Sequence, residues 1–224
     1  MSSFEQQPLL REGALEQPAE RTDARAVFGQ VMGLVAVTVG FFALGAYLGR
    51  NLSGGAGIAL FIAAFACAFG LNFAARRSEA LAIVLLFAMG LLLGMGLGTT
   101  LAYYANSDPG VLWQSGGATA LFVGALGSYG YATRRDLSSW ARTLFWLLIA
   151  LIVFGIVLIF VNIPGGHLIY AVLGLAIFGA YTIFDFNRLR RANMDAAVPI
   201  AAGIFLDVVN VFLFFLTIFG GSRR

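Results

Sequence analysis

Long runs of apolar residues, separated by short polar connections, make up most of this chain. The runs cover residues 26–49, 56–74, 79–103, 112–132, 140–161, 167–187 and 197–219. Each is about 19–25 residues long, which is the length of helix that crosses a hydrocarbon core of ~30 Å. No run alternates apolar and polar residues with a period of two, so membrane β-strands are not indicated. The pattern predicts seven transmembrane helices.

The composition agrees with a chain that lies mostly in lipid. Of its 224 residues, 60% are hydrophobic and 11% are charged, whereas a soluble domain carries about 25% charged residues. We therefore predict an all-α integral membrane protein, a bundle of seven transmembrane helices over residues 26–224. Residues 1–25 are polar, mixed in charge and lack the apolar core of a signal peptide, so we predict a disordered cytoplasmic tail.

The basic residues are distributed unequally between the two faces of the predicted bundle. All 14 are arginine, and 11 of them fall in the tail and in or beside the connections after the second, fourth and sixth runs. Basic residues accumulate on the cytoplasmic side of a membrane protein. We therefore predict that this arginine-rich face and the N-terminus are cytoplasmic, and seven crossings place the C-terminus outside.

Glycine is spaced for close helix packing in two of the predicted helices. Gly90, Gly94 and Gly98 repeat every four residues, and Gly29 and Gly33 have the same spacing. Small residues at this spacing lie on one helical face and let a neighbouring backbone approach. We predict tight contacts at both sets of glycines.

Two carboxylates, Asp185 and Asp207, lie well inside apolar runs. A carboxylate at membrane depth costs a few kcal/mol or more, so it normally faces a cavity or a partner. The two runs form an antiparallel hairpin in which Asp207 lies ~15 Å past the turn, and modest tilt would bring the side chains together. Repulsion between like charges then favours sharing one proton, and the ionised oxygens suit a hard cation such as calcium. Asp185 and Asp207 are therefore our candidates for pH sensing, gating and metal binding.

Three other polar residues could extend this candidate site. Arg76 and Arg77 end the second run on the same face as Asp185, and either could reach the carboxylates as a latch. The alternative for them is ordinary extension toward the lipid headgroups, which we favour for Arg77. Asn210 follows Asp207 by three residues and could extend its polar face.

A purely structural role for the aspartates is the main alternative. Asp185 could pair with Arg188, one helical turn on, and Asp207 could accept a hydrogen bond that fixes packing. Catalysis has little support, because no serine or cysteine nucleophile matches an intramembrane histidine, and the only histidine, His167, lies at the end of a run. An intramembrane aspartyl protease is the one enzymatic rival, and the glycine-rich motif of such proteases is missing around Asp207. We expect no enzyme activity and no cofactor.

Four segments of the chain, together with the order in which they occur, resemble segments of a known family. They are Ile-Phe-Asp-Phe-Asn-Arg-Leu at 183–189, Leu-Asp-Val-Val-Asn-Val-Phe at 206–212, Thr-Arg-Arg-Asp-Leu-Ser at 133–138 and Gly-Leu-Leu-Leu-Gly-Met-Gly-Leu at 90–97. With this spacing the chain resembles the Bax inhibitor-1-like family, also called the transmembrane Bax inhibitor motif family. The likeness is greatest to bacterial members described as pH-sensitive calcium leak channels. Some of those members carry an acidic residue in the second helix, where this chain has Phe65.

The resemblance implies a fold, a mechanism and a location. It implies that the last helix is central and wrapped by the first six. It implies that Asp185 and Asp207 are the proton-sensing pair, that Arg76 contacts them in one state, and that acid favours the closed arrangement. Calcium ions, protons and the lipid bilayer would be the partners, in a bacterial inner membrane and without nucleic acid. The alternative function is a regulator that binds another membrane protein, such as a membrane protease or a cell-death factor, without ion flux.

Overall fold

The computed structural model describes the backbone of residues 6–52 and 54–221, and it is almost entirely helical. The α-helices are α1 (Gln6–Gly49), α2 (Gly54–Ala74), α3 (Glu79–Ser107), α4 (Pro109–Ala132), α5 (Trp140–Phe160), α6 (Gly166–Leu189) and α7 (Ala197–Gly221), with a short 3₁₀ helix, η1 (Met194–Ala196), before α7. No strand occurs within these described residues. The prediction of an all-α protein is confirmed, and each apolar run corresponds to one helix.

Six of these helical segments are long and apolar enough to cross a membrane. They are Ala24–Gly49, Gly55–Ala74, Glu79–Ser107, Trp140–Phe160, Gly166–Leu189 and Met194–Gly221. The remaining long helix, α4, is less apolar, because glycine, Gln114, Ser115 and Thr119 interrupt its hydrophobic residues. The chain is therefore an integral membrane protein with six clear spans among the described residues.

The first helix begins earlier than we predicted. It starts at Gln6, so residues 6–25 are helical in the structure where we expected a disordered tail. Glu, Gln, Leu, Arg and Ala, which favour helix, dominate this segment. Residues 1–5 of the predicted tail lie outside the described residues.

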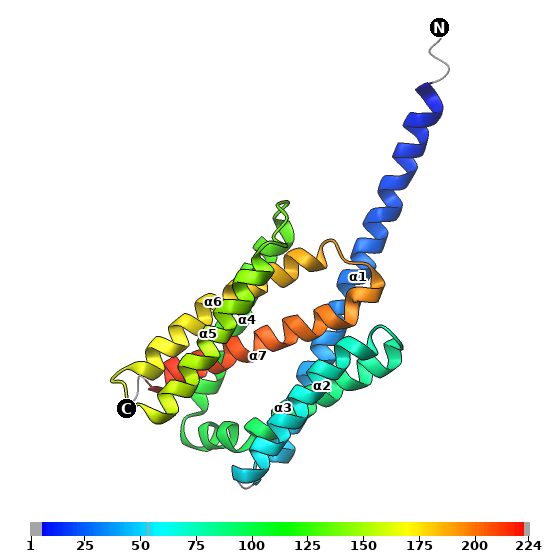
Figure 1. The fold of residues 1–224 in the computed structure, drawn as a ribbon. Coiled ribbons are helices and arrows are strands. Elements are labelled where there is room, and N and C mark those ends of the chain that lie inside the picture. Colours follow the sequence, from blue (N-terminus) through cyan, green and yellow to red (C-terminus); the bar gives the residue numbers. More distant parts are fainter. Residues whose placement is uncertain (1–5, 53, 222–224) are drawn as a thin grey trace.

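The helices run back and forth between two ends of the molecule (Figure 1). The connections α2–α3, α4–α5 and α6–α7 lie toward the end where α1 enters, which is the arginine-rich face. Helix α7 packs against α1, α2, α3, α4 and α6, while α5 packs against α6. Large side chains of α7 are accordingly among the most buried in the described chain, including Ile200, Ile204 and Phe205.

The contact between α1 and α3 depends on the glycines of α3. A Cβ atom on Gly94 would overlap the backbone oxygen of Phe42, and one on Gly98 would overlap the backbone of Gly49. The prediction of close packing at Gly90, Gly94 and Gly98 is confirmed. The prediction for Gly29 and Gly33 is wrong, because no atom lies within 4 Å of a Cβ built at either position. That stretch of α1 borders a groove, and the close approach occurs nearer its other end, at Gly45 and Gly49.

Candidate functional site

The two intramembrane aspartates lie at the interface between α6 and α7. Asp185 is 7% exposed and Asp207 is 3% exposed. Asp185 is close to the end of α6 at Leu189, and the chain returns through η1 so that α7 runs back along α6. Both carboxylates are therefore removed from solvent and lipid by the packing of two consecutive helices.

Gly203 sets the register of the two acids. A Cβ atom at Gly203 would overlap Oδ2 of Asp185 and lie 3.2 Å from its Cγ, so the carboxylate of Asp185 lies directly against the backbone of α7. Asp207 follows Gly203 by four residues, which places it one turn further along the same face of α7. Its Oδ2 is buried and has no hydrogen-bond partner. The structure thus brings the two acids into one neighbourhood, with Asp207 deeper than Asp185.

The charges around this pair come mainly from α6. Asp185 and Asp207 interact electrostatically with each other. Arg188, which is exposed and one turn after Asp185, is the cation whose charge acts on Asp185. Tyr181 is one turn before Asp185 and lies within electrostatic range of both carboxylates. Arg188 forms no ion pair with Asp185 within the described residues, so the local pairing that we considered as an alternative is limited to an electrostatic effect at longer range.

The two candidate latch residues lie away from the acids. Arg76 and Arg77 are exposed in the turn that follows α2, where the Arg77 amide donates to the Ala74 oxygen. Neither forms an ion pair with Asp185 or Asp207 in the described part of the chain. The latch therefore remains a prediction about a different conformation.

Asn210 lies beside a cavity of about 300 Å³ among α2, α3, α5, α6 and α7. Its Nδ2 donates to the Leu206 oxygen at 2.8 Å. The wall is otherwise largely apolar, and Phe65 of α2, 61% exposed, contributes to it. Asp207 does not line this cavity, so the extension of its polar surface by Asn210 stays a prediction.

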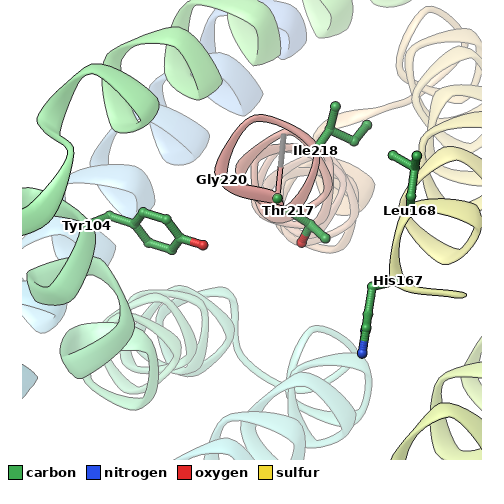
Figure 2. Close-up of a pocket in the computed structure, with 7 residues that line it drawn as sticks. Tyr104, His167, Leu168, Thr217, Ile218 and Gly220 are labelled. Atoms are coloured by element: carbon green, nitrogen blue, oxygen red, sulfur yellow. The ribbon is translucent and has the colours of Figure 1, made fainter. Parts of the chain in front are cut away.

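Two further cavities lie toward the ends of α7. A cavity of about 730 Å³ at the arginine-rich face is lined by Phe184 and Arg188 of α6, by Arg191 of the turn after α6 and by Ile200 of α7. At the opposite end, a cavity of about 420 Å³ includes Tyr104, His167, Thr217 and Gly220. Figure 2 shows Tyr104 on one side of the end of α7 and His167 of α6 on the other. Along α7, Ile200 lines the first cavity, and Leu206 and Asn210, on either side of Asp207 in the chain, line the cavity beside Asn210.

A buried amide, which the sequence reasoning missed, holds the end of α6 that carries Asp185. Asn187 is 2% exposed. Its Nδ2 donates to the backbone oxygens of Gly130 at 3.3 Å, Thr133 at 3.0 Å and Arg135 at 3.1 Å. Its Oδ1 accepts from the Leu137 amide at 3.4 Å. The connection between α4 and α5 is therefore fastened to α6 two residues after Asp185.

An ion pair extends this network to the surface. Arg191 donates to Oδ1 of Asn187 at 2.7 Å and pairs with Asp136 at 2.7 Å. Hydrogen bonds from the Ser138 hydroxyl and amide, together with Arg191, lower the pKa of Asp136 to about 2. Asp136 therefore stays ionised at any moderately acid pH. The sequence did carry a feature that could have identified each missed residue. Asn187 is a polar residue two positions after an intramembrane acid, and Gly203 is a glycine one turn before Asp207.

The chemistry available here is that of a carboxylate pair. No group of three His, Cys, Asp or Glu side chains lies together in the described part of the chain. Two acids, of which Asp207 has a buried Oδ2 without a hydrogen-bond partner, can hold a proton or offer oxygen ligands to a hard cation. A tightly held calcium ion takes six to eight oxygen ligands, so this site suits a passing ion better than a resident one.

Comparisons with known proteins place the chain in a family. The family model described as inhibitor of apoptosis-promoting Bax1 matches residues 24–224. An uncharacterised protein of Helicobacter pylori is 30% identical over 161 residues, which cover 71% of this chain and 70% of that protein. An uncharacterised membrane protein of Vibrio cholerae is 29% identical over 58% of this chain and 59% of its own length. The inner membrane protein YbhL of Escherichia coli is 30% identical over 47% of this chain and 50% of its own length.

Proposed function

This chain belongs to the Bax inhibitor-1-like family, and from that premise we propose that it is a pH-sensitive calcium leak channel gated by Asp185 and Asp207. The observation that carries the proposal is the burial of both carboxylates in one neighbourhood, with Oδ2 of Asp207 unpartnered. An acid in this position is costly unless it works with a proton, a cation or a partner. A relative named as an inner membrane protein supports a bacterial inner membrane as the location.

The path of the ion would follow α7. The three cavities border α7 from Ile200 to Gly221, a rise of ~32 Å that matches the hydrocarbon core. In this proposal α4 also crosses the membrane, which gives seven spans, six of them around a central α7. The arginine-rich face, with the N-terminus, is cytoplasmic because basic residues accumulate on that side.

Protonation would decide whether the path is open. When the pair shares a proton, the two acids can stay close and the interface between α6 and α7 stays shut. When both ionise, repulsion separates them, and their oxygens attract a divalent cation. The described conformation, with both acids buried, fits the closed state, and Arg188 or Arg76 would stabilise the charged form.

Calcium flux into liposomes tests the proposal. Purified protein is reconstituted into vesicles that hold a calcium-sensitive dye, and flux is compared at acid and alkaline pH. We expect faster flux at alkaline pH for the wild type and loss of the pH response in Asp207→Asn. Asp195→Asn is the matched control, because it removes the same charge from an exposed residue of η1 and should keep the wild-type response.

Two results would contradict the channel. Vesicles with folded wild-type protein could show no more flux than empty vesicles at either pH, which would favour the regulator that binds another membrane protein. Alternatively, Asp207→Asn and Asp195→Asn could respond to pH identically, which would remove the buried pair from the gate.

A further inference from the structure

A groove of about 800 Å³ lies between α1 and α4, apart from the aspartate pair. Arg25, Phe28 and Met32 of α1 form one wall, and α4 residues between Thr119 and Ala132 form the other. Phe186 of α6 and Val208 of α7 contribute to its lining as well. The groove is open at Gly124, which is exposed and has no atom within 4 Å of a Cβ built on it.

The groove has the length of one membrane leaflet. From Ala132 to Thr119 the helix rises ~20 Å, and half of a ~30 Å hydrocarbon core is ~15 Å. Ala132 lies at the arginine-rich end of α4, and Arg25 lies at the same end of the membrane segment of α1. The groove therefore begins at the membrane surface on that face and ends near the bilayer centre.

The chemistry of the groove changes along this length. Arg25, at the surface end, is exposed and positively charged, and Arg134 and Arg135 follow the end of α4. Deeper residues are apolar or small, including Met32, Val123 and Gly127. A cation at the headgroup level followed by a leaflet-deep apolar channel is complementary to an anionic phospholipid.

The width of the groove favours a lipid acyl chain over a partner helix as its occupant. The rings of Phe28 and Tyr131 meet across it at its surface end, with centroids 5.1 Å apart. A packed helix needs 8–10 Å between axes along its whole length, so this contact blocks a partner helix there. A single acyl chain is much thinner than a helix, so it needs far less space beside the two rings.

We infer that this groove binds one acyl chain of an anionic phospholipid from the leaflet at the arginine-rich face, with the phosphate beside Arg25. The lipid fills space that α1 and α4 leave between them. None of the groove residues lines the three cavities along α7, although Phe186 and Val208 directly follow the two acids in the chain.

Native mass spectrometry of the purified full chain tests the inference with phosphatidylglycerol and phosphatidylcholine as probes. Gly124→Leu places a side chain in the groove, whereas Gly117→Leu is the matched control, since Gly117 also has nothing within 4 Å but does not line the groove. We expect wild type and Gly117→Leu to retain phosphatidylglycerol in preference, and Gly124→Leu to lose binding by about tenfold, or 1.4 kcal/mol. Thermal unfolding of both variants verifies that they fold.

The headgroup contact is tested separately with Arg25→Gln. This variant should bind the two lipids equally, while Arg142→Gln, at an exposed arginine away from the groove, keeps the preference for phosphatidylglycerol. The inference is overturned if folded Gly124→Leu binds phosphatidylglycerol as wild type does. A wild-type dimer that Gly124→Leu dissociates, with no change in bound lipid, would also overturn it and assign the groove to a second copy of the chain.

Discussion

Replacing Asn187 with alanine should destabilise the protein far more than its size suggests. The side chain is 2% exposed and holds the connection between α4 and α5 against α6. Its Nδ2 has two protons for three carbonyl oxygens, so one donation is shared, and its Oδ1 accepts from Leu137 and Arg191. Alanine would leave these groups without their partner, in a region that is mostly buried.

The expected loss follows from the number of hydrogen bonds. Four effective bonds at about 1 kcal/mol each give ~4 kcal/mol. In a chain of this length, each kcal/mol shifts the unfolding midpoint by about 2–4 °C. Asn187→Ala should therefore lower the midpoint by about 10 °C.

The single cysteine supplies the assay. Cys67 is partly buried in α2, and a thiol-reactive fluorescent dye reports its exposure as the protein is heated in detergent. Asn72→Ala is the matched control, because Asn72 is exposed near the end of α2 and makes one hydrogen bond, to the Ala68 oxygen of its own helix. Its midpoint should stay near that of the wild type, as expected for a surface substitution within about 0.5 kcal/mol.

Equal midpoints for Asn187→Ala and Asn72→Ala would refute this reasoning. The connection between α4 and α5 would then be held by packing alone. Asn187→Asp adds a sharper test, since it keeps an acceptor for Arg191 but sets a carboxylate against three carbonyl oxygens. It should remain clearly less stable than the wild type at neutral pH.

Other contacts of the described helices give three more outcomes. Gly203→Ala should displace the Asp185 carboxylate and change the pH dependence of calcium flux in the liposome assay, whereas unchanged flux would mean that this contact is not part of the gate. Gly94→Leu should cost about 3 kcal/mol or more in the thermal assay, and Gly33→Leu, which meets open space, much less; equal costs would contradict the packing argument. Asp136, with its pKa lowered to about 2, stabilises the fold fully above about pH 4 and loses this effect as pH falls through 2. Asp136→Asn should therefore lower the midpoint at neutral pH by an amount that vanishes near pH 2, and a difference that persists there would contradict the ion pair.

The pattern of apolar runs was enough to locate the helices, because the bilayer requires helices of a minimum length. The predicted runs and α2 to α7 agree within a few residues at each end. The spacing of Gly90, Gly94 and Gly98 also predicted a close helix contact correctly. The same spacing at Gly29 and Gly33 predicted a contact that does not exist, since periodicity identifies a helix face and not what that face meets.

The site was only partly accessible to sequence reasoning. Asp185 and Asp207 could be chosen because charge at membrane depth is costly wherever it occurs. The part played by Gly203, one turn from Asp207, required the register of α7 against α6. The partners of Asn187 at the end of α4 and in the connection to α5 lie 50 to 57 residues away along the chain, and no local pattern predicts such a contact.

By itself, the sequence determined that this chain is helical, lies in a membrane and carries two acids at membrane depth, where a carboxylate is energetically unfavourable. These properties depend on residue chemistry and on the thickness of the bilayer. Only the tertiary structure decided which helix faces meet. It placed the carboxylate of Asp185 on the backbone of Gly203, left Arg76 exposed and left Gly29 and Gly33 without a neighbouring helix. These features depend on how helices that are distant in the sequence pack against one another. That packing minimises empty space and unpartnered polar groups over the whole bundle at once.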